Sequence, residues 1–380
     1  MGTTTSRFRW VGSKAGLQLI GVSSVVPSMR TILTIALCAA TLILVGASFL
    51  ALVETNAWWV RMTDFPRLQY VIALLVLLVA LALSRPVSGP VRLGLAAAAL
   101  AAIAYNAVKL VPYLPLRDGV AASCPADSRV SIIVANVKLE NDESGTLLEM
   151  VRARAPDLLL ALETNEWWEA ELEGLSDRLP HEVSEITGSY FGMHLRSRLP
   201  LSDTEAVYPV EQDAPAIFAT MELPSGREVR LFAIHPRPPH PDQSSTGRDA
   251  ELMWAALAAR DATRPVMLAG DLNAVPWERT IERMQRIGGF IDPRESLGFM
   301  PTYDAQSWWM AWPLDQVLHQ RGLSVLSMEV LPGFGSDHYP IEVALCDDPT
   351  PFDAPALRDD DIAEARTTID AALAGPAEDH

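Results

Sequence analysis

Polar side chains end or interrupt several apolar, strand-like runs of this 380-residue chain. Each apolar run buries its strand, so a polar residue at its end must lie at the rim of a sheet, where it can find partners. Five places fit this description: Asn136, Glu163, His235, Asp271 with Asn273, and Asp337 with His338.

These residue types suit metal-assisted chemistry. Carboxylates gathered at one sheet rim repel one another unless a cation neutralises them. Carboxylate and amide oxygens suit a hard cation, Mg²⁺ or Mn²⁺, and not zinc. A carboxylate beside a histidine fixes the imidazole tautomer and raises its basicity, which adds proton handling.

The elements that must position these residues form one α/β domain. Strand and helix patterns interleave, and the connections mix hairpins with crossovers, which indicates two packed sheets with helices outside. A dinucleotide fingerprint, a P-loop and a G-x-S-x-G elbow are all missing from the sequence. Strands are predicted at 130–137, 157–163, 182–187, 190–195, 216–223, 228–234, 266–269, and near 314–319, 323–331 and 339–345, and helices at 145–154, 167–179, 246–262 and 278–287.

The N-terminal third predicts a membrane anchor. Residues 31–53 carry no charge, and at about 1.5 Å per residue they can cross a hydrocarbon core of about 30 Å. Shorter uncharged runs follow at 68–84 and 93–108, and the last reaches a usable length if Lys109 snorkels. A cleaved signal peptide is the alternative for the first run, but the charged leader is long and two more runs follow.

The distribution of Lys and Arg predicts the orientation. The leader 1–30 has four bases and no acids, loop 54–67 has two of each, and loop 85–92 has two bases and no acids. The leader is therefore expected inside, and three crossings place the chain after about residue 112 outside, in the periplasm of a bacterium. If the third run does not span, the following domain is cytoplasmic instead.

The distribution of charge also separates the N-terminal third from the rest of the chain. Residues 1–116 hold nine bases and two acids, whereas 347–380 hold two bases and ten acids, and the whole chain carries a net charge of −17. Three cysteines exclude a disulfide-dense scaffold, and the acidic middle disfavours a protein that coats polyanions. The predicted parts are a basic cytoplasmic leader (1–30), an anchor of three transmembrane helices (31–114), a linker (115–128), a catalytic domain (129–346) and an acidic, mostly disordered tail (347–380) in which a short helix fits 359–373.

Six motifs in order make residues 129–346 resemble the endonuclease/exonuclease/phosphatase superfamily, the DNase I-like phosphoesterases. The preceding anchor resembles a membrane-bound bacterial branch of that family. The motifs are Asn136 at a strand end, Pro156–Glu163 (PDLLLALE), Ala233–Pro236 (AIHP), Ala269–Ala274 (AGDLNA), Leu314–Leu318 (LDQVL) and Gly335–Pro340 (GSDHYP).

The resemblance implies a four-layer α/β sandwich with a metal site at one rim. Glu163 would be the principal ligand of Mg²⁺ or Mn²⁺. Asn136 and Asp337 would complete or support the metal shell, and Asp271 would help to ligate it.

The same resemblance assigns the remaining roles. Asn273 would orient the phosphate or the attacking water, and His235 would contact the phosphate. His338, held by Asp315, would act as a general base or as a charged stabiliser of the transition state. Whether Asp271 or His338 takes the proton of the water stays open.

Some positions depart from the family pattern. Gln316 stands where many members have His or Tyr, and His194 and Arg196 replace small or apolar residues. Tyr190 is a candidate for a catalytic tyrosine. Trp308, Trp309 and Trp312 form either a hydrophobic rim for a lipid or base, or a loop packed on the core or on the membrane surface.

Cys124 and Cys346 flank the expected catalytic domain. The family fold implies that the first and last strands of the domain are neighbours. In an oxidising compartment, a disulfide between these two cysteines is therefore a hypothesis.

Together these features predict a membrane-anchored, metal-dependent phosphoesterase that hydrolyses a phosphodiester, or a phosphomonoester, outside the cytoplasm. Its partners would be the lipid bilayer, through residues 31–114, and a phosphate ester: a lipid head group, a small phosphodiester or nucleic acid. The alternatives are a nuclease acting on DNA or RNA and a non-catalytic membrane scaffold with a retained fold.

Overall fold

The computed structural model describes residues 4–8, 21–25, 28–84, 87–115, 123–241, 243–350 and 352–375. The chain divides into two compact units. A mainly helical unit holds residues 1–52 and 67–107, and the second unit holds residues 53–66 and 108–380. Most of the leader 1–30 lies outside the described residues, apart from β1 (Thr4–Phe8) and β2 (Gly21–Val25), which pair antiparallel.

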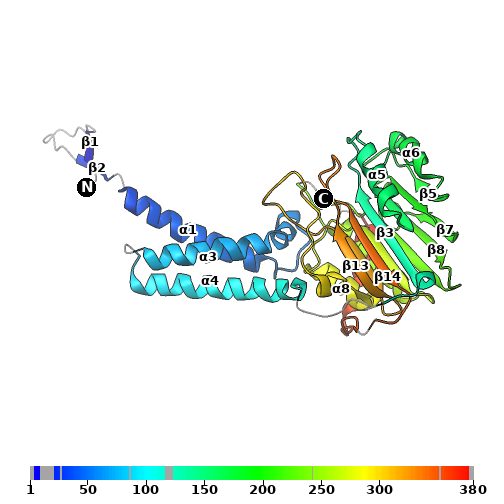
Figure 1. Cartoon of the computed structure of the whole chain (residues 1–380). Coiled ribbons are helices and arrows are strands. Elements are labelled where there is room, and N and C mark those ends of the chain that lie inside the picture. Colours follow the sequence, from blue (N-terminus) through cyan, green and yellow to red (C-terminus); the bar gives the residue numbers. More distant parts are fainter. Residues whose placement is uncertain are drawn as a thin grey trace. The chain divides into compact units, whose positions relative to one another are not determined.

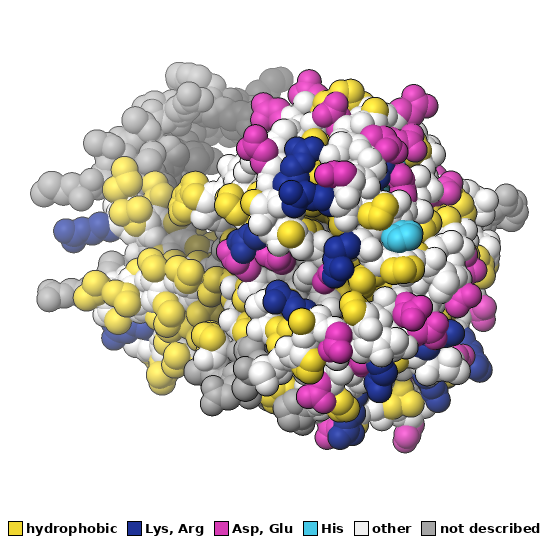
Figure 2. Space-filling view, turned by 45° about the vertical axis from the view of Figure 1, so that its right-hand side comes forward, with side chains coloured by type: hydrophobic (Ala, Val, Ile, Leu, Met, Phe, Trp, Pro, Cys, Tyr) yellow, Lys and Arg dark blue, Asp and Glu magenta, His cyan; other side chains and the backbone are white. Residues whose placement is uncertain are grey.

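Three apolar helices make up most of the first unit: α1 (Met29–Leu50), α3 (Arg67–Leu83) and α4 (Gly89–Leu110). Two helices of the described chain, α1 and the helix that runs from Gly89 to Tyr113, are long and apolar enough to cross a membrane. A third crossing counts only if α3 is joined to the bent segment 58–64 that precedes it. By length and composition, two of the three predicted spans are thus supported, and the surface of this unit is largely apolar (Figure 2).

A buried polar contact holds this unit together. Asn106 lies inside it, where its Nδ2 donates to Ser48 Oγ at 2.9 Å and its Oδ1 accepts from Arg67 Nη1 at 2.8 Å. These bonds satisfy polar groups that would otherwise be costly to bury among apolar helices.

Two six-stranded mixed sheets form the second unit, in the orders β11-β12-β10-β9-β8-β7 and β13-β14-β3-β4-β6-β5 (Figure 1). The strands are β3 (Arg129–Asn136), β4 (Leu158–Leu162), β5 (His181–Glu185), β6 (Met193–Ser197), β7 (Leu201–Val207), β8 (Ala216–Glu222), β9 (Glu228–Ile234), β10 (Val266–Asp271), β11 (Phe290–Ile291), β12 (Asp315–Gln320), β13 (Ser324–Val330) and β14 (Ile341–Cys346). The helices are α2 (Trp58–Arg61), α5 (Gly145–Arg154), α6 (Glu166–Leu172), α7 (Thr246–Arg260), α8 (Arg279–Gly288), α9 (Arg294–Leu297) and α10 (Asp361–Leu373).

Alternation along the strands builds three apolar layers. Ile132 of β3 and Ala219 of β8 belong to the core between the sheets, whereas Ile133 faces outward against helix α5. The outer face of the other sheet packs on α7, α8 and α10. This arrangement confirms the two packed mixed sheets flanked by helices.

Several elements differ from the sequence prediction, among them one helix and two strands of the second unit. Helix α6 ends at Leu172 and runs into a 3₁₀ turn (Glu173–Leu175) instead of reaching 179, in a stretch where Gly174 weakens helix propensity. Strand β7 was missed because it is an edge strand with mostly exposed polar side chains and no apolar alternation. The short strand β11 was also missed.

The C-terminal tail contains the helix α10, which docks on the rest of the second unit. Helix α10 buries Ala365 and packs Ile362 and Ile369 against α7 and α8. Arg286 adds two hydrogen bonds to Asp361, at 2.7 and 2.8 Å. The short helix expected at 359–373 is therefore present at residues 361–373, where a one-sided apolar stripe gives this acidic segment a surface on which to dock.

A disulfide joins Cys124 to Cys346 with the two Cα atoms 5.8 Å apart. Strands β3 and β14 pair antiparallel, and Cys346 lies opposite Arg129. The hypothesis of a bond between these cysteines is confirmed, and the bond ties the linker to the end of the last strand.

Candidate active site

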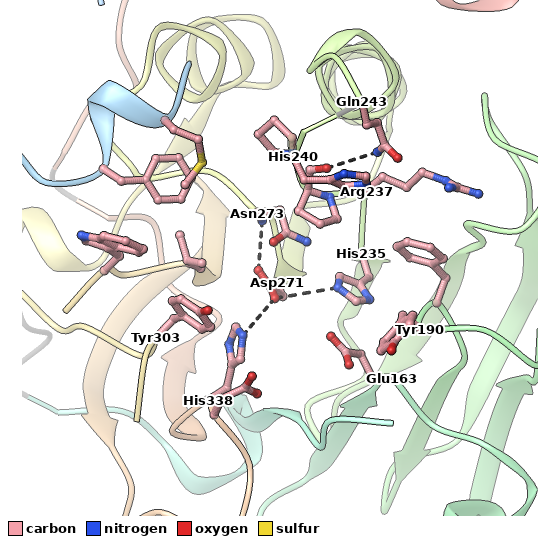
Figure 3. Close-up of a pocket in the computed structure, with 18 residues that line it drawn as sticks. Glu163, Tyr190, His235, Arg237, His240, Gln243, Asp271, Asn273, Tyr303 and His338 are labelled. Atoms are coloured by element: carbon pink, nitrogen blue, oxygen red, sulfur yellow. Dashed lines mark hydrogen bonds and ion pairs between the residues drawn. The ribbon is translucent and has the colours of Figure 1, made fainter. Parts of the chain in front are cut away.

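A cavity of about 490 Å³ opens at the rim where both sheets end their central strands (Figure 3). It is lined by residues from the expected site and by others that the sequence analysis did not select. The expected residues that line it are Glu163, His235, Asp271, Asn273, Asp337 and His338. Asn136 and Asp315 lie directly behind this lining and bond to it.

Asn136 joins the two sheets at this rim. It ends β3, Glu163 follows β4, and these parallel strands are in register with Asn136 beside Leu162. Asn136 Nδ2 donates to Glu163 Oε1 at 2.8 Å and to Asp271 Oδ2, at the end of β10, at 3.2 Å. One amide thus links a carboxylate from each sheet.

Local backbone geometry aims these side chains. Glu163 and Asn273 adopt left-handed conformations, with φ of 60° and 48°, which are uncommon for residues other than glycine. Gly270 has φ of 153°, and a Cβ there would lie 1.8 Å from the carbonyl oxygen of Ile234. The close approach of β9 and β10 therefore requires glycine immediately before Asp271.

Asp271 is the centre of the site. Asn273 donates its backbone N–H to Asp271 Oδ1 at 2.9 Å. The Nε2 atoms of His235 and His338 lie 3.8 and 3.6 Å from Asp271 Oδ2. Figure 3 shows Asp271 between the two histidines, with Glu163 across the cavity from Asn273.

His338 is held by a second carboxylate. Its Nδ1 lies 2.7 Å from Asp315 Oδ2, as the resemblance implied, and its side chain is buried. Burial disfavours the charged imidazole, but the negative charges of Asp315 and Asp271 outweigh burial and raise the pKa of His338 to about 10. The ring therefore favours the charged form, donating from Nδ1 to Asp315 and placing Nε2 at ion-pair distance, 3.6 Å, from Asp271 Oδ2.

The burial of the Glu163 carboxylate is not offset by opposite charges to the same extent as the burial of His338. Burial raises its pKa, and the charge of Asp271 adds to that effect, while His235 and the Asn136 hydrogen bond oppose it. Two neighbouring carboxylates that share one amide donor are the arrangement a divalent cation would stabilise. Glu163 and Asp271 thus fit a hard metal ion. Asp271, Asp315 and His338 also form a group with ligand-type atoms close together. In this group the imidazole of His338 lies between the two carboxylates and already compensates their negative charge, so the group has less need of a metal ion.

Two expected metal ligands have other partners. Asn136 Oδ1 accepts the backbone N–H of Lys138 at 3.0 Å, so the Asn136 amide enters the site as a donor. Asp337 lines the cavity, but its Oδ2 lies 3.3 Å from Lys138 Nζ. Their geometry favours a supporting role around Glu163 and Asp271.

The remaining residues that the sequence analysis singled out, Tyr190, Gln316 and the tryptophans, have different surroundings in the structure. Tyr190 lines the cavity, but its hydroxyl donates to Glu140. Gln316 is buried outside the lining, where it donates to the Ala274 carbonyl and accepts from Arg294. Of the three tryptophans, Trp312 is buried and lines the cavity, whereas Trp308 is 94% exposed.

A second group of metal-type side chains lies outside the cavity. His194 is buried near Glu169 and Glu182, at 3.8 and 3.6 Å from its Nε2. Arg196 donates to Glu182 Oε2 at 2.8 Å and already supplies a positive charge there. These residues stabilise the outer face of β6 and do not extend the site.

Sequence reasoning named Trp312 for a hydrophobic rim, as one of two alternatives, but missed Met62 and Phe65, which complete that wall of the cavity. Met62 and Phe65 line it together with Tyr303, Trp312 and Leu314. Met62 and Phe65 precede α3 by a few residues, far along the chain from every motif, and only their apolar character in a short loop marks them.

The model of the endonuclease/exonuclease/phosphatase family matches residues 133–338, which is more than half of the chain. The chain belongs to the endonuclease/exonuclease/phosphatase family. Members of this family are usually metal-dependent phosphoester hydrolases. The matched range begins in β3 and ends at His338, so it contains every expected site residue.

Solved structures of the endonuclease/exonuclease/phosphatase family are similar to the chain. D. rerio TDP2 in complex with a single-strand DNA product is 18% identical, with a TM-score of 0.49, over 57% of this chain and 99% of that one. An endonuclease/exonuclease/phosphatase from Beutenbergia cavernae is 18% identical, with a TM-score of 0.48, over 58% of this chain and 72% of that one. No curated protein matches the chain by sequence.

Proposed function

We propose that the chain is a membrane-anchored phosphoesterase that uses Mg²⁺ or Mn²⁺ to hydrolyse a phosphodiester outside the cytoplasm. The observation that carries the proposal is the arrangement around Asp271, which two histidines and two asparagine groups approach, with Glu163 facing it. A family scaffold without activity would not need this buried, charged set.

The residues divide the work of hydrolysis. Asn273 and His235 orient the phosphate, and the charged His338 stabilises negative charge that builds on its oxygens. Because Asp315 and Asp271 raise the pKa of His338 and so favour its charged form, we assign Asp271 as the group that orients the attacking water and accepts its proton. Glu163 and Asp271 would hold the divalent ion, which offsets charge on the non-bridging and leaving oxygens.

The predicted anchor and the disulfide support a location of the catalytic domain outside the cytoplasm. Two helices have the length and composition of membrane spans, and the bias of Lys and Arg favours an inside leader. Disulfides persist in oxidising compartments, so the bond between Cys124 and Cys346 favours a domain outside the cytoplasm.

Charge argues against a long nucleic acid as the substrate. Binding a phosphate backbone needs several cations along its track. Among the described residues that line the cavity, Arg237 is the one arginine or lysine, and it already pairs with Asp213. Figure 2 shows acidic side chains widely scattered over the visible face of this unit.

Glu163→Gln tests the proposal. Full-length protein in detergent should hydrolyse a generic phosphodiester with Mg²⁺ or Mn²⁺ and stop when a chelator is added. Glu163→Gln should lower kcat/KM by roughly 100-fold or more, because it removes a charge that holds the ion. The matched control is Glu166→Gln, an exposed glutamate of α6 outside the cavity, which should stay within about twofold of wild type.

Single- and double-stranded nucleic acid, phospholipids, inositol phosphates and a phosphomonoester complete the substrate panel. Chelator-resistant turnover, or equal turnover by both variants, would refute the assignment of the site.

A further inference from the structure

The segment Val53–Pro66, which we name the anchor loop, folds as part of the second unit although it joins α1 to α3. Its main chain is fixed by hydrogen bonds to that unit. Trp277 Nε1 donates to the Asp64 carbonyl at 2.8 Å, and Arg279 Nη2 donates to the Thr55 carbonyl at 2.8 Å. The anchor loop is therefore an integral part of the second unit, which carries the candidate active site and is called the catalytic unit below.

A buried ion-pair network fixes the anchor loop more firmly. Arg61 is 2% exposed, and it pairs with Asp249 at 3.1 Å and with Glu278. Arg248 pairs with the same two carboxylates, and its Nη1 donates to the Asn273 carbonyl at 2.8 Å. Two buried arginines and two buried acids neutralise one another, and the network links the anchor loop to the loop that carries Asn273.

The anchor loop then presents apolar side chains to the cavity. Phe65 packs edge-on against Trp312, with ring centroids 5.3 Å apart, and Met62 packs on the same cluster. Leu314 and Tyr303 continue this wall. Figure 3 shows the light-blue ribbon of the anchor loop at the edge of the pocket, on the same side as Tyr303.

The cavity is therefore two-sided. One side carries Glu163, His235, Asp271 and Asn273, which suit a phosphate and a cation. The anchor loop and its cluster build an apolar wall, and Phe191, Pro238 and Pro239 are further apolar residues of the lining. A ligand that satisfies both must join a charged phosphate to an apolar group, because a polar substituent would lose its hydration against this wall.

We propose that the anchor loop is a specificity-determining wall of the active site and that it seats the hydrocarbon part of a phosphodiester. This inference rests on the proposed phosphoesterase activity and names its substrate class. Position along the chain supports it: Phe65 lies two residues before the apolar helix α3, so the wall adjoins in sequence a segment whose composition suits a lipid environment.

The test compares two soluble substrates, methyl and octyl 4-nitrophenyl phosphate, with full-length protein in detergent and the divalent metal. Wild type should favour the octyl ester in kcat/KM. Met62→Ser should lower the octyl-to-methyl ratio by roughly threefold or more, since it removes apolar contact area. The control Met310→Ser changes a methionine of the same cluster that does not line the cavity, and it should keep the wild-type ratio.

The outcomes separate this inference from the proposed function. Failure of wild type to hydrolyse either ester overturns the phosphoesterase itself. Hydrolysis of both esters with a ratio near one, or with a ratio that Met62→Ser leaves unchanged, overturns the role of the anchor loop alone. Vesicles of phosphatidylglycerol with reconstituted protein form a second arm: head-group release supports a bilayer source for the hydrocarbon, and hydrolysis of the octyl ester alone supports a soluble one.

Discussion

Asp315→Asn tests whether Asp315 creates the positive charge on His338. The two groups meet at 2.7 Å, and a charge pair at this distance is worth roughly 6 kcal/mol at an effective dielectric constant of about 20. The rise of the His338 pKa from 6.5 to about 10 corresponds to about 5 kcal/mol. The loss of this one charge therefore cancels the whole rise, while Asn keeps the shape and one oxygen acceptor.

Histidine NMR on the metal-free protein measures this effect directly. The chain has seven histidines, so selective labelling gives few signals, and His338→Gln assigns the relevant one. In the presence of a chelator at pH 8, His338 should be charged in wild type and neutral in Asp315→Asn. Asp337→Asn is the matched control, because Asp337 pairs with Lys138 and contributes least among the acids that raise this pKa. A His338 that stays charged at pH 8 in Asp315→Asn would refute the electrostatic reasoning.

The same variant changes how stability depends on pH. Because the folded pKa lies above 6.5, His338 stabilises the folded chain fully below about pH 6.5, and this contribution is lost as the pH rises toward 10. Between pH 7 and 9 the free energy of unfolding should fall by about 1.4 kcal/mol per pH unit from this group in metal-free wild type. Asp315→Asn should lack this decline in urea unfolding.

Two further predictions concern stability. Cys346→Ser removes the bond to Cys124, which spans a sequence separation of 222 residues, so the free energy of unfolding in urea should fall by about 2–5 kcal/mol, and a reductant should have little further effect; an unchanged unfolding midpoint would contradict it. Burial, together with the charge of Arg196, lowers the pKa of His194 to about 4, so its stabilisation is present above pH 6.5 and lost below it. Wild type should lose about 1.4 kcal/mol from this group between pH 7.5 and 5.5, and His194→Gln should not; parallel pH profiles of the two proteins would exclude this role.

The strand ends of the site were predictable because burial leaves a local signature. Glu163 and Asp271 follow runs whose every residue is buried, so the first polar position after each run had to lie at a rim. Glu163 and Asp271 are brought together by hydrogen bonds from Asn136, and this contact depends on the register of the strands. The sequence predicts that contact only through its resemblance to the family motifs.

The outer face of β6 shows why other positions were not predictable. His194 and Arg196 are buried, against their usual preference, because Arg196 lies opposite Glu182 on β5 and also pairs with Glu173. Cross-strand partners of this kind are set by tertiary packing. For the same reason the apolar stripe of α10 could be noticed, but its docking surface on α7 and α8 could not.

The anchor loop was the least predictable feature, since Arg61 and its partner Glu278 are 217 positions apart. It also constrains the membrane topology more strongly than hydropathy does. The anchor loop and residues 108–380 fold together, so the segment between α1 and α3 and the end of α4 must lie on the same side of any bilayer. If α4 crosses, the connection between α3 and α4 lies on the opposite side, and α3 must cross as well. Its 17 residues span about 26 Å, short of the usual core, so a crossing by α3 would follow from a crossing by α4 rather than from its own length. A topology in which only the last run fails to span would place a bilayer between Arg61 and its partners.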